Sequence, residues 1–156
     1  MQTEAECGDK NTNDWAFASK RFEQTVKYLK SGAESYMIWN LVLDETGLST
    51  AGWAQCSPIV INQATKVVTY TPYYYGSRHF SSFVRPGAIR ISADGSGARG
   101  AAFLNTDGEM VLALENAAAA APVQLHFVDR NFSATLPGKS FNTFVLEPAP
   151  PATPTR

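Results

Sequence analysis

The chain has 156 residues, of which 44% are hydrophobic and 17% are charged, and this composition is typical of a globular protein. Its 13 basic and 14 acidic side chains leave a formal net charge of −1, which excludes the excess of positive charge that nucleic-acid binding requires. The apolar runs are too short for a membrane span, and the polar, acidic first residues do not resemble a signal peptide.

The first part of the chain has the pattern of a strand, a helix and a second strand. Residues 13–32 predict an amphipathic helix that is capped by Asn13 or Asp14 and ended by Gly32. Its apolar side chains recur at a spacing of three and four, namely at Trp15, Ala18, Phe22, Val26 and Leu29. The apolar run YMIWNLVLD at 36–44 predicts a strand buried on both faces, as in a parallel sheet. With the opening QTE as the end of an earlier strand, this order makes a βαβ unit.

Two short strands and a second helix are predicted next. A loop rich in Gly, Ser and Thr at 45–57 precedes SPIVIN at 57–62, and VVTYTP follows at 67–72. Pro72 is placed in the first turn of a helix over 72–84, which Pro86 and Gly87 terminate.

From residue 88 onward the apolar side chains alternate with a period of two. AIRISA at 88–93 places Ile89 and Ile91 inward, and Thr106-Asp107-Gly108 is typical of a hairpin turn. We interpret the alanine run 117–121 as a hairpin loop. The remaining strand patterns are VQLHFVD, with Val123, Leu125 and Phe127 on one face, then NFSATL, and SFNTFVLE after Pro137-Gly138. Five or six short strands of this kind indicate an antiparallel sandwich.

The chain therefore changes class near residue 87, from α/β to all-β. We predict an α/β part at 1–86, a β-sandwich at 87–147 and a proline-rich disordered tail at 148–156. A single βαβα segment cannot close a core, so the first part is expected to be the last quarter of a barrel or sheet.

The two cysteines, Cys7 and Cys56, are too few for a zinc site. A disulfide between them is one interpretation, and two buried free thiols are the favoured one.

Five stretches carry a resemblance to a known family. They are QTEAECGD, YMIWNLVLDETG, VTYTPYYYGSRHFSSFVRPGAIRI, AAFLNTDGEMVLALEN and SFNTFVLE. In this order and spacing they resemble glycoside hydrolase family 30, the group of glucosylceramidases, β-1,6-glucanases and certain xylanases. The resemblance spans Gln2 to about Glu147. It implies a (β/α)8 barrel with a β-sandwich at its side, of which this chain holds barrel strands 7 and 8, helices 7 and 8 and the sandwich. It also implies a secreted or extracytoplasmic protein.

The resemblance implies a catalytic role for Glu4. The family's nucleophile is a glutamate at the end of barrel strand 7 that follows Thr or Ser, and Thr3-Glu4 matches this pattern. Retaining hydrolysis needs a second carboxyl as proton donor. The family's donor follows an asparagine on strand 4, and this sequence has no Asn-Glu pair. An N-terminal barrel segment is therefore expected to be missing, and the isolated chain is expected to be inactive.

Three further residues are candidates for binding the substrate, a carbohydrate or glycolipid for which a β-glucoside is favoured. Trp39 offers an indole face for stacking on a pyranose, and Asn40 offers an amide for its hydroxyls. Trp53 is predicted either to line the same pocket or to pack over the barrel rim. No metal or organic cofactor is expected, because the sequence has no ligand cluster and the reaction needs only carboxyls and water.

Other interpretations of the same residues stay open. Without the resemblance, Glu4 is a solvated terminal glutamate, and Glu6 is either its partner or an exposed carboxylate. His79 and His126 are predicted to be packed or at the surface. The alternative function for the whole chain is a non-catalytic β-sandwich module that packs or binds a glycan.

Overall fold

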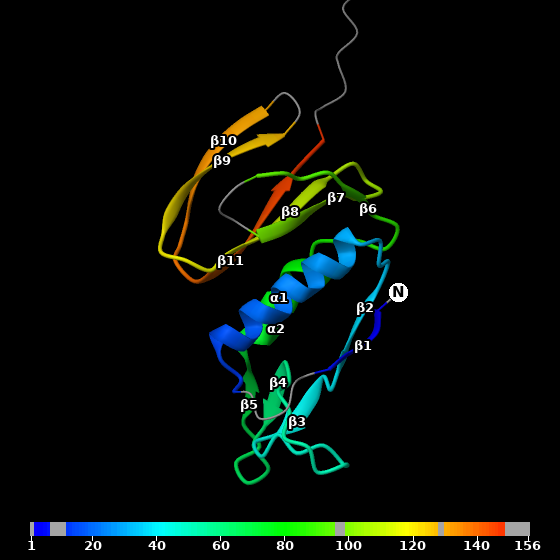
Figure 1. Ribbon diagram of the computed structural model, residues 1–156, viewed down its shortest axis with the longest axis vertical. Coiled ribbons are helices and arrows are strands. Elements are labelled where there is room, and N and C mark those ends of the chain that lie inside the picture. Colours follow the sequence, from blue (N-terminus) through cyan, green and yellow to red (C-terminus); the bar gives the residue numbers. More distant parts are fainter. Residues whose placement is uncertain (1, 7–11, 96–98, 128–129, 149–156) are drawn as a thin grey trace, which may run out of the picture.

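The computed structural model describes residues 12–95, 99–127 and 130–148, together with the strand formed by residues 2–6. Figure 1 shows the helices α1 (Trp15–Lys30) and α2 (Pro72–Ser81) between a sandwich of strands β6 to β11 and the small sheet of β3 to β5. The pair of strands β1 and β2 lies beside α1. The predicted change from α/β to all-β structure is thus present in the fold.

Helix α1 begins and ends where the sequence predicted. The Asp14 carboxylate accepts a hydrogen bond from the Phe17 N–H at 2.9 Å, which satisfies one of the free donors of the first turn. Gly32 follows the helix with a φ of +89°, a left-handed conformation that favours glycine. Helix α2 has Pro72 in its first turn, as predicted, but ends at Ser81, three residues earlier than expected.

The buried surface of α1 is wider than the predicted stripe. Ala18, Phe22 and Val26 are buried as expected, but Phe17 and Arg21 are buried as well. Phe17 packs edge-on against Tyr73 of α2, and the Arg21 guanidinium lies 4.8 Å from the Phe17 ring centroid. The difference arises because α1 contacts α2 on one side and the sandwich on another. A single apolar stripe cannot cover both contacts.

The sandwich has six strands in two antiparallel sheets. The larger sheet has the order β11 (Ser140–Leu146), β8 (Met110–Asn116), β7 (Arg99–Leu104) and β6 (Ile89–Ile91). The smaller sheet pairs β10 (Arg130–Leu136) with β9 (Ala121–Phe127). The hairpin turn between β7 and β8 is confirmed, with Gly108 at a φ of +88° and its N–H donating to the Asn105 carbonyl at 3.0 Å.

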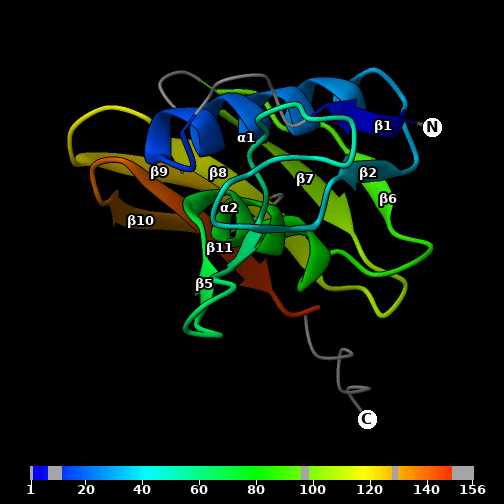
Figure 2. The ribbon, with the colours of Figure 1, turned by 90° about the horizontal axis from the view of Figure 1, so that it is seen from below.

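Strands β7 and β8 are covered on both faces. One face, with Ala102, Leu112 and Leu114, packs on Leu125 and Phe127 of β9. The other face, with Ala101, Phe103 and Ala113, packs on Phe22 and Val26 of α1. Seen from below, α1 crosses β7 and β8, while α2 lies next to β11 (Figure 2). Burial on both faces explains why small alanines occupy the centre of this sheet.

Ile89 departs from its predicted inward position. Its side chain is 66% exposed, although Ile91 does pack against the sandwich core. Strand β6 is the edge of its sheet, and Ile89 pairs with Leu104, which is also exposed. The smaller sheet does not extend over this corner, so alternation alone could not bury Ile89.

The predicted long strand at 36–44 is two shorter strands. Strands β2 (Tyr36–Trp39) and β3 (Val42–Asp44) are separated by a cis peptide bond between Trp39 and Asn40. The expected burial on both faces is wrong, because Met37, Leu41 and Val42 are exposed. Among the strands that the structure describes, β2 pairs only with β1 and β3 only with β4, so neither lies inside a wide sheet.

The small sheets confirm the βαβ unit. Strand β1 (Gln2–Glu6) pairs in parallel with β2, and α1 connects them. Strand β3 pairs in parallel with β4 (Ile59–Ile61), which pairs antiparallel with β5 (Val68–Tyr70). Cys56 is a buried free thiol, whereas Cys7 lies outside the described residues, as does most of the predicted tail. No helix in the described part of the chain is long and apolar enough to cross a membrane.

Candidate functional site

The C-terminal ends of β1 and β2 lie at one edge, where Trp39 and Asn40 are found. In the parallel register Ala5 lies beside Ile38 and Glu6 beside Trp39. Glu4 belongs to β1, in a stretch where the register shifts between Gln2 and Ala5. For Glu4 the structure describes this place in the strand and not its side chain. Glu4 is the middle residue of β1, two residues before Glu6, so it precedes the strand ends at which Trp39 and Asn40 lie.

Asn40 is held by a residue that the sequence did not single out. Its Nδ2 donates a hydrogen bond to Oε1 of Gln55 at 2.7 Å. Gln55 is buried, while Asn40 is half-buried. A buried amide acceptor fixes the orientation of the Asn40 carboxamide, so the remaining polar atoms of Asn40 have a defined direction.

The loop that carries Gln55 and Trp53 is tightly folded. The Gln55 N–H donates to the Gly47 carbonyl at 2.8 Å, and Leu48 and Ala54 form an isolated antiparallel bridge. Gly47 has a φ of +65°, and a Cβ at this position would lie 2.6 Å from the Gln55 carbonyl oxygen. Glycine is therefore favoured here, and the backbones of residues 47 and 55 can lie close together.

Trp53 lies at the surface of this loop. Its carbonyl accepts a hydrogen bond from the Ser49 N–H at 2.9 Å, and its own N–H donates to Ser49 Oγ at 3.3 Å. The Trp53 side chain is 57% exposed and that of Trp39 is 38% exposed. Both indoles therefore keep accessible surface, as a sugar-stacking role would require, although neither exposure identifies a ligand.

The loop is also tied to the start of α1. The Ser57 N–H donates to Oδ1 of Asn13 at 3.0 Å, and Thr71 Oγ1 donates to the Ser57 carbonyl at 2.9 Å. Ser57 and its neighbour Cys56 have no exposed surface. The segment that follows Gln55 is thus anchored to both helices, which makes the support of Asn40 rigid.

Asp44 is a described carboxylate at the end of β3, four residues after Asn40. The Thr46 hydroxyl and backbone N–H donate to Oδ1 of Asp44, and they hold the pKa of its carboxyl below the ordinary value. This arrangement is a local turn that keeps Asp44 ionised. Within the described residues no group of three or more His, Cys, Asp or Glu side chains is arranged for a metal ion.

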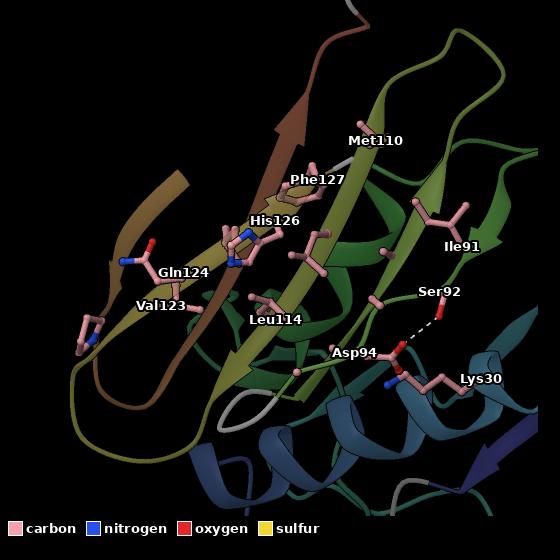
Figure 3. Close-up of a pocket in the computed structure, with 17 residues that line it drawn as sticks. Lys30, Ile91, Ser92, Asp94, Met110, Leu114, Val123, Gln124, His126 and Phe127 are labelled. Atoms are coloured by element: carbon pink, nitrogen blue, oxygen red, sulfur yellow. Dashed lines mark hydrogen bonds between the residues drawn. The ribbon is translucent and has the colours of Figure 1, made fainter. Parts of the chain in front are cut away.

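A hollow in the described residues lies elsewhere, in the sandwich. It is a groove of about 630 Å³ between strands β6 to β8 and strand β9. Figure 3 shows Leu114 and Phe127 along it, with Ser92 donating a hydrogen bond to Asp94 at its rim. Trp39, Asn40 and Trp53 do not line this groove. Its apolar lining belongs to the sandwich core cluster, so it is an opening of that core and not the predicted sugar site.

Gln55 gave only a weak signal in the sequence. It stands in a polar loop, directly before the buried Cys56, and no motif marks it. Its partner Asn40 lies 15 residues away, and a single long-range hydrogen bond of this kind leaves no periodic pattern.

A family model identifies the second half of the chain. The glycosyl hydrolase family 30 beta sandwich domain matches residues 87–144, the segment that forms β6 to β11 up to Phe144. Residues 87–144 belong to the beta sandwich domain of family 30. The resemblance stated from sequence is therefore confirmed for this part of the chain.

Named relatives extend the similarity into the first half. A Caenorhabditis elegans protein named "Putative glucosylceramidase 2" is 31% identical in an alignment 140 residues long, which covers 81% of this chain and 26% of that protein. The Aspergillus fumigatus protein named endo-1,6-beta-D-glucanase neg1 is 32% identical in an alignment 120 residues long, which covers 67% of this chain and 24% of that protein. The chain thus spans about a quarter of the length of these relatives.

Solved structures agree with the fold. The endo-beta1,6-glucanase BT3312 superposes with a TM-score of 0.77 at 26% identity and covers 94% of this chain and 35% of that one. SrfJ from Salmonella typhimurium superposes with a TM-score of 0.82 at 24% identity, with coverages of 93% and 34%. The described fold therefore recurs in these larger solved structures, and this chain matches about a third of each.

Proposed function

We propose that this chain is the C-terminal portion of a retaining β-glycosidase that hydrolyses O-glycosyl bonds, with Glu4 as the nucleophile. In this proposal residues 1–86 are the last quarter of a (β/α)8 barrel, with β1 as its seventh strand and β2 continued by β3 as its eighth. The parallel pairing of β1 with β2, with Glu6 beside Trp39, is the observation that carries the proposal. It supports a common site for the strand that contains Glu4 and the segment Trp39-Asn40.

The proposed chemistry uses two carboxyls. The Glu4 carboxylate attacks the anomeric carbon, and the bond to the leaving oxygen breaks as a glycosyl-enzyme ester forms. A proton donor protonates the leaving oxygen and then activates the water that hydrolyses the ester. We assign this donor to a part of the barrel outside these 156 residues, and we expect the chain by itself to be inactive.

The proposed substrate is a β-glucoside, either in a glycolipid or in a glucan. Two relatives with 31% and 32% identity carry the names of a glucosylceramidase and an endo-1,6-glucanase, and both names denote enzymes that act on β-linked glucose. Trp39 and Trp53 would stack on the sugar, and Asn40 would bind its hydroxyls. The exposed indoles and the braced Asn40 amide support this assignment. A secreted or extracytoplasmic location also stays a proposal.

The test uses a polypeptide that contains the complete barrel and ends with this chain. Glu4→Gln is expected to lower kcat on an aryl β-glucoside by about four orders of magnitude or more, because an amide cannot form the ester. Glu6→Gln, two residues along the same strand, is the matched control and is expected to retain most of the activity. A 2-deoxy-2-fluoro-β-glucoside should trap the ester, and peptide mass mapping should place the label on Glu4.

Two outcomes would contradict the proposal. One is full activity of the Glu4→Gln protein, and the other is a label on a different residue. Hydrolysis by the isolated 156-residue chain that depends on Glu4 would overturn only the expected inactivity. If the complete polypeptide binds a glycan but hydrolyses no glycoside, the non-catalytic carbohydrate-binding function would replace the enzyme.

A further inference from the structure

Glu115 is a carboxylate buried between the sandwich and α1. It lies on β8, on the face that packs against the helix, and it is 1% exposed. Neither of its carboxylate oxygens accepts a hydrogen bond of ordinary geometry from the described residues. A buried charge with so little compensation is costly unless a partner neutralises it or a proton does.

Arg99 forms an ion pair with Glu115 and a second ion pair with Glu23. Arg99 on β7 is the cross-strand neighbour of Glu115, and its Nη2 lies 3.1 Å from Oε2 of Glu115. The same guanidinium forms an ion pair with Glu23 of α1 and donates to Ser19 Oγ of α1 at 3.1 Å. One cation therefore links two carboxylates, one from the sandwich and one from the helix.

The charges around Glu115 can be assigned element by element. Strand β7 contributes Arg99, helix α1 contributes Glu23 and the Ser19 hydroxyl, and β11 contributes the uncharged ring of Phe141 as the other cross-strand neighbour. Burial raises the pKa of the Glu115 carboxyl, and the charge of Glu23 adds to this rise. The Ser19 hydroxyl and the Arg99 guanidinium oppose it without cancelling it.

We propose that Glu115, Arg99 and Glu23 form a proton-sensitive junction between helix α1 and the sandwich, which is strongest when Glu115 carries a proton. With Glu115 ionised, the cluster has two negative charges and one positive charge, and one of the negative charges is desolvated. With Glu115 protonated, Arg99 is left as a balanced partner of Glu23, and the buried side chain is neutral. This inference does not depend on the proposed glycosidase activity.

The sign of the pH effect follows from linkage. Because the folded-state pKa of Glu115 lies above its ordinary value of 4.5, the folded protein binds this proton more tightly than the unfolded chain does. Lowering the pH from neutral toward 4.5 therefore stabilises the fold through this group. Raising the pH through the folded-state pKa removes that stabilisation.

His79 acts in the opposite direction and must be separated from Glu115. Its Nδ1 lies 2.8 Å from Thr143 Oγ1, and burial, with a smaller effect of Arg78, lowers the pKa of its ring below 6.5. This histidine therefore costs stability as the pH falls below 6.5. A single stability curve would mix the two effects, so the test compares variants with the parent protein at each pH.

The first experiment measures thermal unfolding midpoints of the parent chain and Glu115→Gln from about pH 8 to about pH 5. The introduced glutamine has the shape of the protonated glutamate but cannot titrate. The midpoint of the parent is expected to rise relative to the Glu115→Gln variant as the pH falls, so their difference changes steadily across this range. Glu34→Gln removes an exposed carboxylate outside the junction and should show no such change.

A second variant keeps the test informative if Glu115→Gln folds poorly. Arg99→Gln removes the cation and leaves the carboxylate buried, so its midpoint should fall most near neutral pH and recover toward the parent on acidification. In the double variant, Arg99→Gln with Glu115→Gln, that recovery should be absent. A carboxyl carbon NMR titration would follow the Glu115 proton directly, with Glu115→Gln to assign the signal.

The proposal is overturned if the difference between the parent and Glu115→Gln does not vary with pH. It is also overturned if the Glu115 carboxyl signal titrates at or below 4.5, its ordinary value. Equal losses at all pH values in Arg99→Gln would show that Arg99 acts by packing alone, and they would overturn the proposal as well.

Discussion

At the scale of single residues, the best-defined interaction of the candidate site is the pair of amides Asn40 and Gln55. The hydrogen bond of 2.7 Å joins the residue after β2 to the end of a loop that Gly47 keeps compact. Gln55 is buried, so its side chain supports Asn40 and has little surface for a ligand of its own. The proposed sugar contacts thus depend on a residue that itself need not touch the sugar.

This arrangement predicts a stability cost for removing the Gln55 amide. Gln55→Ala is expected to lower the free energy of unfolding by about 1–3 kcal/mol, because it removes a buried acceptor and leaves space around Asn40. Gln63→Ala is the control, since the Gln63 side chain is exposed, and its effect should stay within about 0.5 kcal/mol. Urea denaturation measures both. Equal effects of the two substitutions would contradict the supporting role of Gln55.

At the scale of secondary-structure elements, the close contact of β7 with β8 restricts the size of the side chain at position 100. Gly100 pairs with Leu114, and a Cβ at Gly100 would lie 2.3 Å from the Ala113 carbonyl oxygen and 2.4 Å from Leu114 Cδ2. The backbone of β8 cannot move away easily, because β11 pairs with its other edge. The glycine is therefore required for space and not for an unusual backbone angle.

Substitution of this glycine should weaken the larger sheet. Gly100→Ala is expected to lower the free energy of unfolding by about 1–3 kcal/mol through overpacking. Gly95→Ala is the control, because a Cβ there has no neighbour within 4 Å among the described residues, and it should change stability by less than about 0.5 kcal/mol. Chemical denaturation of both variants checks this. A Gly100→Ala protein as stable as the parent would show that the two strands can separate without cost.

The sequence predicted the hairpin of the sandwich but not the packing contacts between its elements. The period of two after residue 88 and the turn at Gly108 predicted the hairpin correctly, because alternation and turn chemistry are local signals. The burial of Phe17 and Arg21 was missed, because it depends on a second helix that packs from the side. The ion pair of Arg99 with Glu115 also has no local signal, since a charged residue in a strand normally indicates the solvent face.

The candidate site was predictable only in part. The resemblance placed Trp39 and Asn40 near the strand that contains Glu4, and the parallel register agrees with that placement. The break of the strand after Trp39 and the bond to Gln55 were not predicted, because Asn40 is the one polar residue before Asp44 in the apolar run 36–44 and its partner is distant in sequence. The roles of Glu4, Trp39, Asn40 and Trp53 stay predictions.

At the scale of the whole molecule, Phe141 connects the helices with the sandwich. Its ring lies 4.4 Å from Trp15 and 4.9 Å from Phe22 of α1, measured between centroids, and 5.9 Å from His79 of α2. A Cβ on Gly76 of α2 would approach the same ring to 3.1 Å, so α2 lies close against it. One side chain of β11 thus contacts both helices.

This position predicts a large effect of Phe141→Ala. The substitution should lower the free energy of unfolding by about 2–4 kcal/mol, because it leaves a cavity where three elements meet. Phe132→Ala is the control, because this phenylalanine of β10 is 41% exposed, and it should cost less than about 1.5 kcal/mol. Helical circular dichroism and tryptophan fluorescence should report one common transition in the parent chain. Separate transitions of the helices and the sandwich in the parent would contradict this coupling.

The apolar side of β7 and β8 that faces α1 affects which fragments of this chain can be expressed in soluble form. A gene cut at residue 87 would retain the full segment matched by the family model, yet it would bare Ala101, Phe103 and Ala113 to water and leave Glu115 at an open surface. Such a protein should aggregate and be poorly soluble. The shortest soluble fragment should start before α1, because this helix covers the apolar face of β7 and β8.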